Sequence, residues 1–73
     1  MRIIVSFNGG GLTINYEGID KIVNNGQYIT LIGNPLIIVV NSTDICTTEV
    51  LRIQKSWLLT ADEVYFDTRI EEV

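Results

Sequence analysis

The sequence predicts a small all-β protein, an antiparallel meander of about six or seven short strands that curls into a barrel or a sandwich. Residue usage is the first indication, because Ile, Val and Thr make up 26 of the 73 residues. Side chains branched at Cβ are restricted at their first torsion and pack well on a pleated sheet. Short apolar or alternating segments separated by Gly, Asn and Pro are the second indication. The length predicts a single domain covering residues 1–73.

The most apolar segment is the run Leu-Ile-Ile-Val-Val at residues 36–40. Asn34 and Pro35 precede this run, and Asn41 and Ser42 follow it. An unbroken apolar run this short is typical of a strand that is covered on both faces, so we expect it to be central in the sheet. A chain of 73 residues has little material to cover two faces. We therefore expect the protein to associate with itself, which is a common aid to stability in small chains.

The first hairpin has a register that the sequence defines. Every second residue of 3–7 and of 12–16 is apolar, and Asn8 and three glycines lie between the two segments. A tight turn at Gly9 and Gly10, where glycine would supply a positive φ, places all six apolar side chains on one face. The predicted pairs are Phe7 with Leu12, Val5 with Ile14, and Ile3 with Tyr16.

Two further turns are predicted in the middle of the chain. Asn25-Gly26 favours a tight hairpin between strands at residues 19–23 and 27–32. Gly33-Asn34 then predicts another turn, after which residues 36–40 would run antiparallel to residues 27–32. In the second hairpin, the predicted pairs are Ile22 with Ile29 and Val23 with Tyr28.

Two interpretations remain open for residues 48–59. As a helix, this segment would begin at a cap on Thr47 or Thr48, and the fold would be α+β. As a strand, residues 49–59 would turn at residues 60–63 and return as a final strand. Both interpretations bury Trp57 in the core. The helix would form a stripe of Val50, Ile53, Trp57 and Leu58, whereas the strand would pair Leu59 with Val64, Trp57 with Phe66, and Ile53 with Ile70.

No set of residues indicates catalysis or the binding of a metal or cofactor. The chain has no His and a single Cys, Cys46, which excludes an internal disulfide and an ordinary zinc site. Because no His can act as its base, Cys46 is interpreted as a buried or half-buried structural residue. The glycines after Asn8 precede a strand rather than a helix, so they favour a turn over a phosphate-binding loop. We therefore predict no catalytic, cofactor-binding or metal-binding residue and no enzymatic activity.

Charge and hydropathy disfavour nucleic acids and membranes as partners. The net charge is −4, and the five basic residues are spread along the chain, which opposes binding to a polyanion. No apolar stretch is long enough to cross a bilayer, and the first residues do not resemble a signal peptide. The expected location is therefore cytoplasmic. The basic residues are Arg2, Lys21, Arg52, Lys55 and Arg69.

The sequence predicts a non-enzymatic protein–protein interaction module with an acidic surface. A small inhibitor or accessory factor of phage or mobile-element type would act in this way. Frequent Ile and Asn often accompany an AT-rich genome, such as that of a low-GC bacterium or its phage. The alternative is a homo-oligomer that binds a small ligand, such as a nucleotide, in pockets between subunits. In that case a basic side chain and the N–H groups of the glycine turn would contact the ligand.

Overall fold

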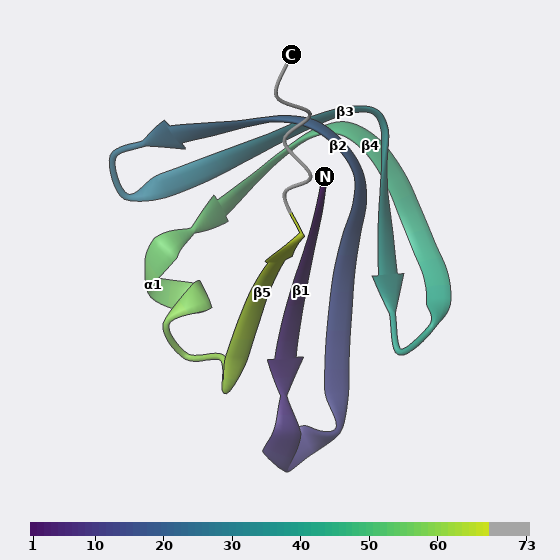
Figure 1. Cartoon of the computed structure of the whole chain (residues 1–73), viewed down its shortest axis with the longest axis vertical. Coiled ribbons are helices and arrows are strands. Elements are labelled where there is room, and N and C mark those ends of the chain that lie inside the picture. Colours follow the sequence, from purple (N-terminus) through teal and green to yellow (C-terminus); the bar gives the residue numbers. More distant parts are fainter. Residues whose placement is uncertain (68–73) are drawn as a thin grey trace.

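A computed structural model of the protein describes residues 1–67 as one antiparallel sheet with strand order β4-β3-β2-β1-β5 (Figure 1). The all-β meander is confirmed, although the described part has five strands, fewer and longer than predicted, and the sheet does not close into a barrel. The elements in chain order are β1 (Arg2–Phe7), a 3₁₀ turn (Asn8–Gly10), β2 (Leu12–Asn25), β3 (Tyr28–Val40), β4 (Thr43–Gln54), a single helical turn α1 (Lys55–Leu58) and β5 (Glu63–Asp67).

The three longest strands, β2, β3 and β4, bend sharply near their middles. A straight strand of 14 residues such as β2 would extend about 47 Å, whereas the molecule measures 39 × 27 × 22 Å. Register shifts mark the bend on both sides of β3, and Figure 1 shows the strands curving over at the top of the view. The bend divides the sheet into a narrow half (residues 19–33 and 49–54) and a wide half (β1, β5 and residues 12–17, 36–40 and 43–48).

Glycine makes the bend possible because the backbones of β2 and β3 approach each other closely there. Gly18 has a φ of +73°, and a Cβ at this position would lie 2.5 Å from the carbonyl oxygen of Pro35. A Cβ on Gly33 would in turn overlap the carbonyl oxygen of Gly18. Any other residue at position 18 would therefore meet both an unfavourable backbone conformation and a steric clash.

The hydrophobic core lies between the two facing halves of the bent sheet. Leu31 from the narrow half and Leu36 from the wide half are almost completely buried, as are Ile3 and Val5 of β1. Burial of these side chains between two parts of the same sheet is the main source of stability that the fold offers. The remaining buried residues of the core cluster are Tyr16, Ile19, Ile29 and Ile53.

The predicted register of the first hairpin is confirmed, with Ile3 opposite Tyr16, Val5 opposite Ile14 and Phe7 opposite Leu12. The predicted turn geometry is wrong, because the chain forms a 3₁₀ turn and the positive φ, +62°, belongs to Gly11. Neither Gly9 nor Gly10 has a positive φ. The carboxylate of Asp62 accepts a hydrogen bond of 2.6 Å from the N–H of Asn8, which attaches this turn to the start of β5.

The other two predicted turns need correction. Ile22 lies opposite Leu31 rather than Ile29, because the tight turn is centred on Gly26 and Gln27. A positive φ at Gly26 alone is typical of a type II′ turn, in which glycine occupies the first central position. The turn predicted at Gly33-Asn34 is a bend within β3, so residues 36–40 continue the strand of residues 28–32 instead of running antiparallel to it.

The central position predicted for residues 36–40 is nevertheless confirmed. This segment pairs with β2 on one side and with β4 on the other. Leu36 and Val39 are buried, and the three remaining residues of the run are half-buried. Apolar residues are tolerated at every position of this run because both faces of the sheet are at least partly covered at this strand.

Residues 48–59 combine the two predicted interpretations. The strand ends at Gln54, and the helix is a single turn, Lys55–Leu58, which carries the chain across to the wide half of the sheet. The predicted pairs of Leu59 with Val64 and of Trp57 with Phe66 are wrong, because β5 pairs with β1 and Val64 lies opposite Val5. Ile70, the predicted partner of Ile53, lies outside the described residues. In its pairing with β1, Val64 packs against the core.

Candidate protein-binding edge

Both edge strands of the open sheet carry exposed apolar side chains. On β4, Ile45 and Val50 are each 57% exposed, and on β5, Tyr65 is 51% and Phe66 47% exposed. An edge strand also presents unpaired backbone N–H and C=O groups, and proteins usually protect such edges with charges, prolines or covering loops. Apolar side chains beside a free backbone edge therefore indicate a surface that can pair with another chain.

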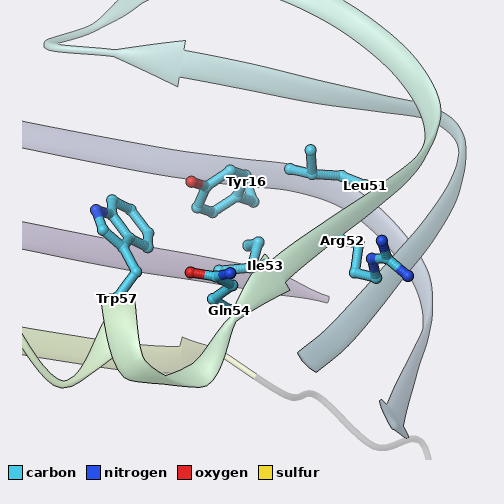
Figure 2. A pocket seen from close by; sticks show the side chains of 6 residues that line it. All are labelled: Tyr16, Leu51, Arg52, Ile53, Gln54 and Trp57. Carbon is cyan, nitrogen blue, oxygen red and sulfur yellow. The ribbon is translucent and has the colours of Figure 1, made fainter. Parts of the chain in front are cut away.

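A hollow of about 320 Å³ opens beside the second half of β4. Leu51 and Ile53 of β4 line it from the narrow half, and Tyr16 of β2 lines it from the wide half. Trp57 of α1 forms another wall, and Figure 2 shows its indole extending from α1 toward the Tyr16 ring. The hollow exists because the sheet does not close between β4 and β5, which leaves this part of the interior accessible.

Trp57 is half-buried rather than buried, so the expectation that it is a core residue is only partly correct. Its indole packs against the ring of Phe7, with the ring centroids 5.6 Å apart and the planes tilted by 48°. This contact holds Trp57 in place as a wall of the hollow, because Phe7 itself packs against the core. The carbonyl oxygen of Trp57 accepts a hydrogen bond of 2.6 Å from the hydroxyl of Thr60, which ends the helical turn.

The residues that line the hollow are mainly apolar or aromatic, with Arg52 and Gln54 as the polar members. Arg52 contributes to the rim, but its guanidinium lies 4.5 Å from the centroid of the Tyr28 ring. Alternate residues of a strand face opposite sides, so Arg52 and Tyr28 lie on the side of the sheet opposite Leu51 and Ile53. Burial raises the pKa of the Tyr16 phenol above its ordinary value, so this side chain is a neutral wall of the hollow at physiological pH.

The free edge formed by β5 differs from that of β4 in charge. Asp62, Glu63 and Asp67 lie along or beside this short strand. The Asp67 carboxylate forms an ion pair of 3.1 Å with Arg2 of β1, whereas Glu63 is exposed at the first position of the strand. The β4 edge carries both Glu49 and Arg52 close to exposed Val50, so it presents charges of both signs, whereas the described residues of β5 carry carboxylates alone.

The residues considered for chemistry in the sequence do not converge on one site. Cys46 is exposed on the edge strand β4, not buried or half-buried as predicted. Within residues 1–67, no group of three His, Cys, Asp or Glu residues could hold a metal ion. The glycine turn lies at the end of the β1–β2 hairpin and does not contribute to the hollow.

The basic residues proposed as ligand contacts are also dispersed. Arg2 is paired with Asp67, Arg52 stacks on Tyr28, and the Lys55 ammonium donates a hydrogen bond to the side-chain oxygen of Asn24. Lys21 is exposed on β2 at the bend, and Arg69 lies outside the described residues. Within a single subunit, the described cations therefore form no common anion-binding site.

Sequence reasoning missed the β4 edge as a candidate site. Val50 faces one side of β4, and Leu51 and Ile53 face the other, so the strand has apolar residues on both faces. That pattern usually indicates a strand covered on both sides, yet β4 is an edge strand. The combination was visible in the sequence, but its meaning depends on the position of the strand in the sheet.

No protein-family profile, curated protein sequence or solved structure matches this chain. Within the part of the chain that the structure describes, no helix has the length and apolar character needed to cross a membrane.

Proposed function

We propose that this protein is a non-enzymatic protein-binding module that receives an extended segment of a partner along residues 49–53 of β4. The observation that supports this function best is the free strand edge next to an apolar hollow. When a peptide adds a strand to a sheet, its backbone pairs with the edge and alternate side chains enter pockets beside it. Here the hollow walled by Leu51, Ile53, Tyr16 and Trp57 is the pocket, and exposed Val50 is a contact on the opposite face.

The chemical character of the side chains that line the hollow also favours binding over catalysis. The hollow is lined mainly by apolar and aromatic side chains, which suits the capture of a side chain such as Leu, Val or Phe. General acid–base or nucleophilic chemistry needs a positioned titratable group near the reacting atoms. A docking module of this size would suit a small inhibitor or accessory factor, which acts by occupying a surface of its partner.

A small-ligand function is the second candidate, and one observation favours it. The volume of about 320 Å³ is near the lower limit of ligand pockets, which commonly measure about 300–1,000 Å³. An aromatic ring could lie between Tyr16 and Trp57. A nucleotide would also need a cation directed into the hollow, whereas the Arg52 guanidinium lies over Tyr28 on the other face.

The sole tryptophan of the chain gives the test an internal reporter. Peptides are selected on the immobilised protein from a random-peptide display library, and the selected peptides are then measured in solution. We expect peptides with alternating apolar residues, which shift Trp57 emission to shorter wavelength and protect it from iodide quenching. Peptides that bind without changing Trp57 emission or quenching, or a selection that gives no binding peptide, would contradict the proposed function.

Two matched variants locate the binding edge. Val50→Lys and Thr47→Lys both place a charge at an exposed position of β4, but only Val50 lies within the proposed binding segment, residues 49–53. We expect Val50→Lys to weaken peptide binding at least tenfold and Thr47→Lys to leave it nearly unchanged. If the two variants weakened peptide binding equally, residues 49–53 would not be the binding segment. A melting temperature raised by nucleotides, with no peptide bound, would favour the ligand alternative instead.

A further inference from the structure

We infer that the segment bound along β4 belongs to a different protein and runs antiparallel to β4. It carries an acidic residue, two apolar residues and a basic residue, in that order from its N-terminus. This inference rests on the proposed function, because it names the partner of the same edge. The observation that carries it is the position of two opposite charges, Glu49 and Arg52, on either side of the apolar pair Val50 and Leu51.

The backbone of β4 defines which of its residues can bond to a partner. The N–H of Lys55, directly after β4, donates a hydrogen bond of 2.9 Å to the carbonyl of Gln27, directly before β3. In an antiparallel ladder, directly opposite residues exchange hydrogen bonds at every second position. Leu51, four positions before Lys55, therefore also directs its N–H and C=O toward β3. Val50 and Arg52 direct theirs toward the free edge.

The two charges lie on different sides of the strand. Leu51 packs on the core side of the sheet. Alternate residues of a strand face opposite sides, so Glu49 shares the core side with Leu51, and Arg52 shares the outer side with Val50. Both charged residues are exposed, and neither has an ion-pair partner among the described residues. Each charge is therefore available to a partner residue placed directly opposite it.

The outer side of the narrow half is positively charged near this edge. Lys21 lies opposite Ile32, and Ile32 lies opposite Val50, so Lys21 is on the same side of the sheet as Arg52. One face of the Arg52 guanidinium stacks on Tyr28, and its in-plane N–H groups remain able to bind a carboxylate. The paired segments of this half contain no carboxylate in residues 21–25, 28–32 and 50–54. An acidic side chain is therefore favoured opposite Arg52.

The order of the charges distinguishes the two possible strand directions. In an antiparallel partner, the residue opposite Arg52 comes first and the residue opposite Glu49 comes three positions later. The matching order is therefore acidic, apolar, apolar, basic, and a parallel partner would need the reverse. Antiparallel pairing is slightly more stable per residue. In that arrangement the second partner residue lies opposite Leu51, beside the hollow, and the third covers Val50.

A second copy of this chain does not meet these requirements. Residues 49–52 have the inferred order themselves, but pairing two such segments would place Val50 opposite Leu51. Directly opposite residues of an antiparallel pair direct their backbone groups both toward the partner or both away from it, and here only Val50 directs them outward. The other edge strand, β5, contains no basic residue in Glu63–Asp67. The occupant is therefore a segment of another protein.

Two peptides of identical composition test the inferred order. Both have blocked ends and two Thr residues on each side of a central segment, which is Glu-Leu-Val-Lys in the first peptide and Lys-Leu-Val-Glu in the second. In titrations followed by Trp57 fluorescence, we expect the first peptide to bind about fivefold more tightly or better, because two attractive cross-strand pairs replace two repulsive ones. The preference should become small at about 1 M salt, which screens exposed charges.

A charge-exchanged protein is the matched control. Glu49→Arg and Arg52→Glu are made together in one chain, which retains its net charge, Val50 and the hollow. We expect this variant to prefer the second peptide by about the same factor. Loss of the stacking on Tyr28, or a general loss of stability, would weaken both peptides alike and would not invert the preference.

A nitroxide label at the N-terminus of the first peptide tests the strand direction. In the antiparallel arrangement this end lies beyond Arg52, so NMR signals of Ile53 should broaden more than those of Thr48. Stronger broadening at Thr48 would show parallel pairing and overturn the inference.

The affinities separate failure of this inference from failure of the proposed function. Equal affinities of the two peptides for the original chain, or no inversion in the charge-exchanged protein, would overturn the inferred order of charges. If both peptides still shifted the emission of Trp57, the proposed function would stand. If neither these peptides nor the selected ones changed Trp57 emission or quenching, both the inference and the proposed function would be contradicted.

Discussion

The middle and the edges of the sheet differ in what their apolar residues do. The middle strands β1, β2 and β3 supply almost all the buried side chains, including Ile3, Val5, Leu31 and Leu36. Among the described residues of the edge strands, only Ile53 is buried, while four large apolar side chains are exposed on β4 and β5. The fold therefore depends on its middle strands. The exposed apolar residues of the edges contribute little to the core of one chain and remain accessible to another chain.

The sharpest comparison of the two regions is a pair of alanine substitutions. Leu31→Ala opens a cavity in a fully buried site and should cost about 2–5 kcal/mol of unfolding free energy. A core of this size rarely supplies more than about 3–5 kcal/mol, so the variant should be largely unfolded. Val50→Ala changes an exposed side chain and should alter the free energy by about 0.5 kcal/mol or less in dilute solution. Urea titrations followed by circular dichroism measure the free energy of unfolding of both variants. Similar losses would contradict the distinction between the middle strands and the edge strands.

The bend between the two halves is tested by a pair of glycine substitutions. Gly18→Ala meets the carbonyl oxygen of Pro35 and a φ of +73°, so it should cost about 2–4 kcal/mol. Gly9→Ala is the control, because a Cβ there has no neighbour within 4 Å and φ is not positive. Thermal melts should show a much lower midpoint for Gly18→Ala alone. Equal midpoints would mean that the bend tolerates a side chain at position 18.

A smaller effect is expected at alkaline pH from Tyr16, which lies between the core and the hollow. Burial raises the pKa of its phenol above the ordinary value of 10.0, so the folded chain retains the proton more tightly than the unfolded chain. The stabilisation of the folded state that comes from this pKa difference is therefore complete below pH 10. It is lost as the pH rises through the pKa of the folded state. Tyr16→Phe should lose stability less steeply above pH 10 in urea titrations. Equal slopes for both proteins would contradict this expectation.

Local patterns in the sequence predicted the parts of the fold that depend on neighbouring residues. The alternation in residues 3–7 and 12–16 gave the register of the first hairpin, and the apolar run 36–40 gave a central strand. Both predictions succeed because side-chain alternation and burial leave a direct record in the sequence.

The errors arose where contacts between distant residues decide the structure. Gly33 and Asn34 have the composition of a turn, but the approach of Gly18 makes them a bend within one long strand. Residues 49–59 alternate well enough to predict a hairpin with residues 64–71, yet β5 pairs with β1, which is far away in sequence. The positive φ of the first turn lies at Gly11 rather than at Gly9 or Gly10, and Asp62, far away in sequence, binds the N–H of Asn8 in the same turn.

The candidate site could be predicted even less from the sequence. Its walls come from β2, β4 and α1, and their proximity depends on the bend and on the open side of the sheet. The exposed residues Val50 and Tyr65 are ordinary strand residues in the sequence. Their significance appears only when β4 and β5 are known to be the two edges.

Amide hydrogen exchange with and without a bound peptide tests most directly whether the β4 edge is completed by another chain. Exchange is followed by NMR in the presence and absence of the selected peptides, with the β1–β2 hairpin as an internal reference. We expect the peptides to protect the amides of Val50 and Arg52, which face the free edge, while the reference amides exchange at constant rates. Unchanged exchange at Val50 and Arg52 would contradict the account, and so would protection that rises equally in all strands.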